Sequence, residues 1–173
     1  RAIMETYDLT RDLEPTRPIN DASGYVHVKT DIFSIHDYDQ NIESWKEKYQ
    51  SVNPNNKERA FIRYPEISVP YNGEPYVVDE YGGTFWTRDY AEMDEQGDSR
   101  TQWGYGKTEE QVKDLIEALT SVLLNNPNIA GYCYTQLYDV EAEVNGIYSY
   151  EREPKFDIKQ VREIFAAPAA IEE

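Results

Sequence analysis

Short apolar runs that end in polar side chains recur along this chain and predict its strands. Runs at 31–38, 75–83 and 129–136 are rich in β-branched and aromatic residues and lie between Gly, Pro or polar clusters. Such runs are typical of buried strands. A shorter and weaker run of the same kind lies at 18–24. Because a longer segment follows each run, the pattern predicts an α/β fold with about four parallel βα units.

Two segments between these runs carry the apolar period of a helix. In 108–126, Thr108 and Gln111 form a capping box, and apolar residues follow at helical spacing on one face. The segment 41–50 presents apolar residues at the same spacing, so both stripes are expected to pack on the sheet. The opening segment 2–9 also reads as helix, although no capping residue precedes it.

The remaining segments are predicted to be connections and a tail. The segment 51–73, with its Asn and Pro clusters, and the acidic segment 87–101 are expected to be surface excursions. Residues 166–173 are expected to form a poorly ordered tail after a single domain that covers 1–165.

A carboxylate stands at the end of the central predicted strand. The run 75–83 ends in Asp79 and Glu80, followed by Tyr81 and a pair of glycines. In parallel barrels the chemistry lies at the carboxyl ends of the strands. Because side chains alternate along a strand, Asp79 and Glu80 are expected on opposite sides, with only one at the barrel mouth. The glycines are expected to leave room for a substrate ring. The alternative is a buried acid that caps a turn.

Composition and charge narrow the classes of function. The 173 residues carry a formal net charge of −16, which argues against binding to nucleic acid or to an anionic membrane surface. No apolar run is long enough to span a bilayer. The 15 Tyr, 3 Trp and 5 Phe suit a sugar site, although aromatic residues are also good core material. The single Cys133 excludes an internal disulfide and is expected to be a buried, inert thiol.

Several motifs, taken in their order and spacing, point to one family. They are Leu-Glu-Pro-Thr-Arg-Pro at 13–18, Asp-Glu-Tyr-Gly-Gly at 79–83, Trp-Gly-Tyr-Gly at 103–106, and the segment 131–141 with Asn-Gly at 145–146. Together they resemble the catalytic domain of glycoside hydrolase family 2, the family of β-galactosidases and β-glucuronidases. The resemblance implies a (β/α)8 TIM barrel in which a glutamate at the end of strand seven is the nucleophile. That role falls on Glu80.

One departure from the family pattern predicts that the chain is a fragment. The family's acid/base glutamate lies in an Asn-Glu pair at the end of strand four, and no such pair precedes the first predicted strand here. A complete barrel needs roughly 250 residues. We therefore expect the C-terminal half of the barrel, strands five to eight, beginning in the helix after strand four. The N-terminal half-barrel and the β-sandwich domains would be its missing partners. The isolated chain is expected to be inactive and to self-associate.

The resemblance implies a retaining exo-β-glycosidase of the β-galactosidase type, which hydrolyses terminal β-linked sugars through a covalent glycosyl-enzyme intermediate. Such an enzyme needs two carboxyl groups about 5–5.5 Å apart, one ionised and one protonated. A β-glucuronidase is the alternative within the class, and it would need basic or amide groups for the substrate carboxylate. A non-catalytic carbohydrate-binding segment is the alternative outside it.

Further site residues follow from the strand ends. Tyr38 resembles the family's tyrosine beside the nucleophile and would donate a hydrogen bond to Glu80. By alternation His36 shares its side of the strand and could contact sugar hydroxyls, whereas Asp37 faces the other way. Trp86 is a candidate for stacking on a sugar ring, and Trp103 is either a second such residue or loop packing.

The segment after the last predicted strand supplies the other candidates. Gln136 and Asp139 are expected to contact substrate. Asp139, Glu141 and Glu143 alternate and could hold Mg²⁺ or Ca²⁺, but they lack the EF-hand spacing. A solvated acidic loop is therefore expected, with no metal and no cofactor.

Overall fold

The computed structural model describes residues 1–88 and 107–173. Its strands are β1 (Phe33–Asp37), β2 (Tyr76–Gly82) and β3 (Ile129–Thr135), and its α-helices are α1 (Ala2–Leu13), α2 (Ile42–Tyr49), α4 (Glu109–Leu124) and α5 (Ile158–Phe165). Two 3₁₀ turns, η1 (Lys57–Arg59) and η3 (Ala170–Glu172), complete the described elements. None of the described helices is long and apolar enough to cross a membrane. Most of the predicted acidic loop, and Trp103, lie outside the described residues.

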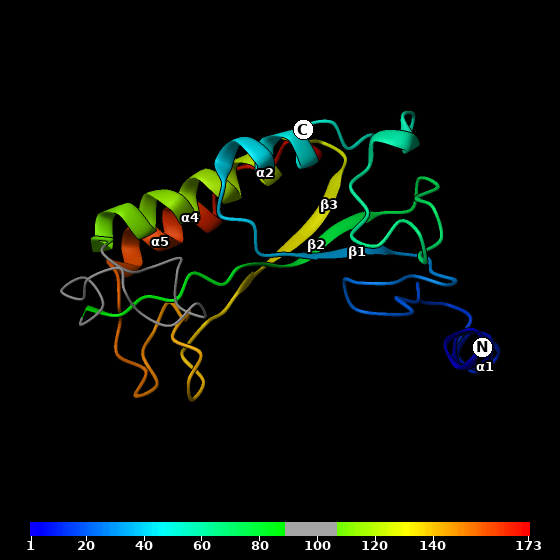
Figure 1. Cartoon of the computed structure of the whole chain (residues 1–173), viewed down its shortest axis with the longest axis horizontal. Coiled ribbons are helices and arrows are strands. Elements are labelled where there is room, and N and C mark those ends of the chain that lie inside the picture. Colours follow the sequence, from blue (N-terminus) through cyan, green and yellow to red (C-terminus); the bar gives the residue numbers. More distant parts are fainter. Residues whose placement is uncertain (89–106) are drawn as a thin grey trace.

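The strands form one parallel sheet in the order β1-β2-β3. Figure 1 shows α2, α4 and α5 together on one face of this sheet, with α1 apart from them at the N-terminal end. Parallel neighbours need crossover connections, and α2 and α4 lie in the two crossovers. The predicted α/β class with parallel strands is therefore confirmed.

The weakest of the predicted strands is not formed. Residues 18–24 contain no strand, so the described residues give three strands rather than four. Much of the backbone hydrogen bonding of this segment goes to side chains instead of a neighbouring strand. The Ile19 amide donates to Asp31 Oδ2 at 2.7 Å, and the Gly24 amide donates to Ser34 Oγ at 2.9 Å. Side-chain acceptors have replaced a regular ladder here.

The helices predicted over 41–50 and 108–126 are present with about the predicted ends, whereas α1 continues to Leu13, beyond the predicted segment 2–9. Thr108 caps α4 in a capping box with Gln111, as the sequence predicts, and Asn41 accepts the Ser44 amide at the start of α2. These caps satisfy amides that would otherwise lack partners in the first turn. The short helix α5 is not foreseen in the sequence analysis, although Asp157 accepts two amides at its start.

The main core lies between the sheet and its helices. The fully buried Trp45 of α2 donates its indole N–H to the Leu119 carbonyl of α4 at 3.0 Å, which ties the two helices together. The predicted surface excursion 51–73 is not wholly a surface feature, because Val52 and Tyr71 are buried in the same core. Burial of a tyrosine ring removes much apolar area from water, which explains why the segment folds back.

Cys133 corrects a further expectation, because its thiol is exposed rather than buried. It lies on β3, an edge strand of the described sheet. The neighbouring Tyr134 packs against Phe165 of α5, with ring centroids 5.6 Å apart. Since side chains alternate on a strand, Cys133 lies on the sheet face away from that helix. A half-barrel would present this face to its interior.

Candidate active site

A cavity of about 440 Å³ lies at the carboxyl ends of β2 and β3. Its lining residues are Tyr38, Glu80, Gly83, Phe85, Thr135, Gln136, Glu143 and Asn145. The set combines two carboxylates, two amides and hydroxyl groups. It contains no Lys or Arg among the described residues. Carboxylates beside hydrogen-bonding groups suit acid–base or nucleophilic chemistry on a polyhydroxylated substrate.

Glu80 and Tyr38 form the centre of this cavity. The Tyr38 hydroxyl donates a hydrogen bond to Glu80 Oε2, so the donor that the sequence predicts for this carboxylate is in contact with it. Burial, and then the hydrogen bond to Glu80, raise the pKa of Tyr38 above its ordinary value. The phenol therefore keeps its proton and remains a donor over the working range of pH. A donor of this kind favours the ionised form of a carboxylate.

The two glycines near the end of β2 make room for protein side chains, and Gly83 also lines the cavity. Both have positive φ, 85° at Gly82 and 64° at Gly83, a conformation that favours glycine. A Cβ at Gly83 would lie 2.8 Å from Tyr38 Cδ1, and one at Gly82 would lie 2.2 Å from Tyr134 Cε2. The pair thus lets two tyrosine rings pack against the end of β2.

Regular alternation predicts that Asp79 and Glu80 point to opposite sides of the strand. In the structure they point to the same side. The register of β2 shifts against both neighbours in this region: Ser34 pairs with Val77 and His36 with Glu80, while Val78 pairs with Tyr132 and Tyr81 with Tyr134. One extra residue on β2 is the signature of a β-bulge, which re-aims side chains. Both carboxylates consequently reach the ring of His36, at 3.4 Å for Asp79 and 3.3 Å for Glu80.

On β1 the alternation holds as predicted. His36 and Tyr38 both contact Glu80, whereas Asp37 points into the core. There its carboxylate accepts hydrogen bonds from Lys48 Nζ at 2.8 Å and from the Tyr49 hydroxyl at 3.0 Å. Asp37 is therefore a structural acid, and the pair His36–Tyr38 belongs to the site.

Gln136 and Asp139 lie close in sequence but differ in position. Gln136 lines the cavity and donates to Asn145 Oδ1 at 2.7 Å. Asp139 is only 5% exposed, and its Oδ1 accepts from the Gly146 amide at 2.7 Å and from Lys155 Nζ at 2.8 Å. Burial lowers the pKa of Lys155, against the opposing effect of Asp139. Asp139 thus holds a loop together and is not a solvated acid.

Neither of the two tryptophans proposed for stacking on a sugar ring is among the described residues that line the cavity. Trp86 is 1% exposed, its ring stacks on Phe156 at 5.2 Å between centroids, and its indole N–H donates to the Lys107 carbonyl at 2.8 Å. Trp86 is accordingly a core residue here. Trp103 lies outside the residues that the structure describes.

Several residues around the site are missed by the sequence reasoning. Glu143 and Asn145 line the cavity, whereas the sequence places them only in an acidic loop and in a family motif. Ser23 contacts both His36 and Asp79. The polar end of the segment 18–24 is the only feature of the sequence that points to Ser23. Because this segment is not a strand, alternation does not predict the direction of the Ser23 side chain.

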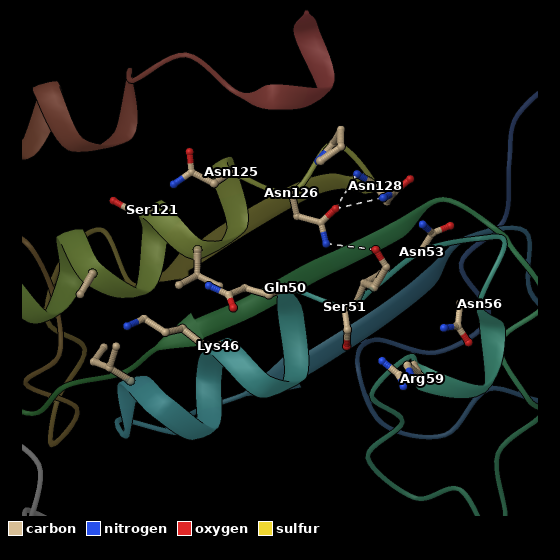
Figure 2. Close-up of a pocket in the computed structure, with 15 residues that line it drawn as sticks. Lys46, Gln50, Ser51, Asn53, Asn56, Arg59, Ser121, Asn125, Asn126 and Asn128 are labelled. Carbon is tan, nitrogen blue, oxygen red and sulfur yellow. Dashed lines mark hydrogen bonds between the residues drawn. The ribbon is translucent and has the colours of Figure 1, made fainter.

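A larger cavity of about 670 Å³ lies between α2 and α4. Figure 2 shows its polar lining, in which Asn53, Asn126 and Asn128 lie close together. Asn126 directs its amide at the carbonyls of Tyr49 and Val52, at 2.7 and 3.1 Å. No carboxylate lines this cavity in the described chain. It also adjoins the amino end of β3, whereas Glu80 lies at the opposite end of the strands. The smaller cavity is therefore the candidate active site.

Comparisons with known proteins bear on the fold. No protein-family model matches the chain, and no curated protein matches it. Among solved structures, it is similar to the β-D-glucuronidase of Dictyoglomus thermophilum, with a TM-score of 0.60, 17% identity, and coverage of 96% of this chain and 29% of that chain. A GH2 β-galacturonidase from Eisenbergiella tayi bound to galacturonate gives a TM-score of 0.60, 18% identity, and coverage of 96% and 30%. A β-glucuronidase from an uncultured Clostridium gives a TM-score of 0.58 and 20% identity, with coverage of 92% of this chain and 28% of that chain.

The chain thus spans less than a third of the length of each of these structures. At such identities the likeness establishes the fold alone. Nearly the whole chain therefore folds as one part of these larger proteins does.

Proposed function

We propose that this chain is the C-terminal half of the catalytic (β/α)8 barrel of a retaining exo-β-glycosidase, with Glu80 as the nucleophile. The observation that carries the proposal is the contact between the Tyr38 hydroxyl and Glu80 in a cavity at the carboxyl end of β2. The full-length protein, meaning the complete barrel that includes this chain, would supply the acid/base carboxyl group from its other half.

The reaction would proceed in two displacements. The Glu80 carboxylate attacks the anomeric carbon while the acid/base group protonates the departing glycosidic oxygen, giving a glycosyl ester on Glu80. Water, deprotonated by the same acid/base group, then attacks the anomeric carbon and releases Glu80 as a carboxylate. Tyr38 holds the carboxylate in place, while Gln136 and Asn145 present amide groups to sugar hydroxyls. His36 Nδ1 lies 3.3 Å from the same Glu80 oxygen, Oε2, that Tyr38 contacts.

A neutral sugar, as in β-galactosides, is the substrate class that the described lining favours. The cavity holds the carboxylates of Glu80 and Glu143 and no described Lys or Arg, so the charge of a uronic acid would be repelled. A uronide is the second candidate. The similar solved structures favour it, because they include a β-D-glucuronidase and a β-galacturonidase. The amides of Gln136 and Asn145, which could bind a carboxylate, favour it as well.

Mass spectrometry of the full-length protein tests this proposal. After treatment with an activated 2-deoxy-2-fluoro-β-galactoside, we expect a covalent adduct on the peptide that carries Glu80. A parallel sample with the corresponding glucuronide separates the two sugar classes, because an adduct formed only there would establish the uronide type. An adduct on any other residue would contradict the assignment of Glu80.

Replacing Tyr38 by Phe should lower kcat in the full-length protein by about 10- to 100-fold. The variant removes one hydrogen bond to a charged acceptor, which contributes about 1.5–3 kcal/mol. The effect should appear in kcat more than in KM, because the hydroxyl contacts Glu80 directly. Tyr150→Phe, at a tyrosine that is 64% exposed, is the matched control. Equal kinetics for both variants would show that Tyr38 only packs.

A further inference from the structure

The ring of His36 lies between two carboxylates in the candidate active site. Its Nε2 is 3.4 Å from Asp79 Oδ1 and its Nδ1 is 3.3 Å from Glu80 Oε2. The backbone at Gly24 packs directly against this ring. Gly24 has φ 69°, and a Cβ at this position would lie 1.8 Å from His36 Cδ2. The imidazole is 6% exposed. Its position is therefore fixed by the surrounding backbone.

Ser23 determines which nitrogen of this ring carries a proton. Its hydroxyl lies 2.8 Å from His36 Nε2 and donates to Asp79 Oδ2 at 3.0 Å. A hydroxyl has one proton, and an ionised carboxylate only accepts. With its proton directed to Asp79, Ser23 must accept from His36, so Nε2 carries a proton. The other ring nitrogen, Nδ1, then faces Glu80.

Charge balance determines the state of Nδ1. In the described part of the chain no ion pair joins Asp79 or Glu80 to a Lys or Arg; their ion-pair partner is His36. Asp79 Oδ1 is moreover buried without a hydrogen-bond partner, and a cation beside this oxygen would compensate for the hydration it has lost. A neutral ring would turn a lone pair at Nδ1 toward Glu80, which is repulsive. The remaining titratable groups on the ring are phenols, Tyr25 at 4.9 Å between ring centroids and Tyr38, which contacts Glu80 Oε2 as well.

We propose that His36 is held as an imidazolium between Asp79 and Glu80, and that Ser23 and Asp79 are positioning residues that keep this cation against the Glu80 carboxylate. The catalytic consequence rests on the function proposed above, because a nucleophilic carboxylate must stay ionised until it attacks. The protonation state of His36 does not depend on that function.

Nitrogen NMR of the histidine rings tests the protonation state without any substrate. The chain contains two histidines, so a His36→Gln variant assigns both rings. His27, whose Nδ1 lies 2.6 Å from Asp21, reports in the same spectrum that the chain is folded. At neutral pH we expect both nitrogens of His36 to be protonated in the wild type, and one to lose its proton in Asp79→Asn. A wild-type ring with one unprotonated nitrogen would overturn the proposal.

Kinetics of the full-length protein test the positioning role independently. Asp79→Asn and Ser23→Ala should each lower kcat by about tenfold or more, the effect of weakening one charge-assisted contact, with KM little changed. Ser23→Thr keeps the hydroxyl and should retain a kcat near that of the wild type. If the role of Ser23 were purely steric, the larger Thr side chain would lower kcat as well. Unchanged kcat in both Asp79→Asn and Ser23→Ala would overturn the role. A fluorosugar adduct on a residue other than Glu80 would instead reject the proposed function and leave the NMR result standing.

Discussion

Replacing Glu80 by Gln in the full-length protein should lower kcat by about 10⁴-fold or more, in the range seen when a nucleophile is removed. The amide keeps the size of the side chain but cannot form the glycosyl ester. Folding should be unaffected, because Glu80 belongs to neither buried cluster of the core. Steady-state hydrolysis of a nitrophenyl glycoside, with circular dichroism as the check on folding, measures both effects.

A second pair of variants separates the nucleophile from a nearby acid. Glu80→Gly should regain part of its activity toward an activated substrate when azide is added, because the anion can attack from the vacated position. Glu143→Gly is the matched control, since it removes another carboxylate from the same cavity and leaves the same space for azide. Azide rescue at Glu143 rather than at Glu80 would transfer the nucleophilic role to that residue.

The 173-residue chain on its own should hydrolyse nitrophenyl β-galactoside no faster than buffer does. A retaining mechanism needs an ionised and a protonated carboxyl group at the same time. Under the function proposed above, the acid/base group would come from the other half of the barrel, so this chain would supply only the nucleophile Glu80. Turnover that disappears in both Glu80→Gln and Glu143→Gln would show that both groups lie within the chain.

The same sample should form dimers or larger species in light scattering. The outer edge of β3 has no paired strand in the described chain, and an open edge is a template for pairing with another copy. The exposed Cys133 on that strand gives a direct probe. Its alkylation should be slower in the associated protein than in dilute solution. An active, monodisperse monomer would contradict the half-barrel proposal.

The sequence predicts best where strands and helices are regular. The shared side of His36 and Tyr38 follows from alternation at the end of β1, and the cap at Thr108 follows from a local pattern. Such features depend on a few neighbouring residues and on a fixed period.

Features that depend on distant parts of the chain are not predictable in this way. The bulge in β2 turns the side chains of Asp79 and Glu80 to the same side. Only the pairing of β2 with β1 and β3 reveals this bulge. The burial of Trp86 depends on Phe156, far along the chain. The segment 18–24 resembles a strand, but side-chain acceptors such as Asp31 and Ser34 bind its backbone instead.

The buried pair of Lys155 and Asp139 would lower the entropic cost of binding a ligand beside Asn145. Lys155 Nζ donates to Asp139 Oδ1 at 2.8 Å and to the carbonyl of Val144 at 2.9 Å. Val144 is the residue immediately before Asn145. A buried ion pair adds little net stability by itself, but it defines geometry. The loop that carries Asn145 is thus ordered before any ligand arrives. Under the function proposed above, a sugar bound there would lose its own freedom of motion without also having to order the protein, so more of its contact energy would remain available as affinity.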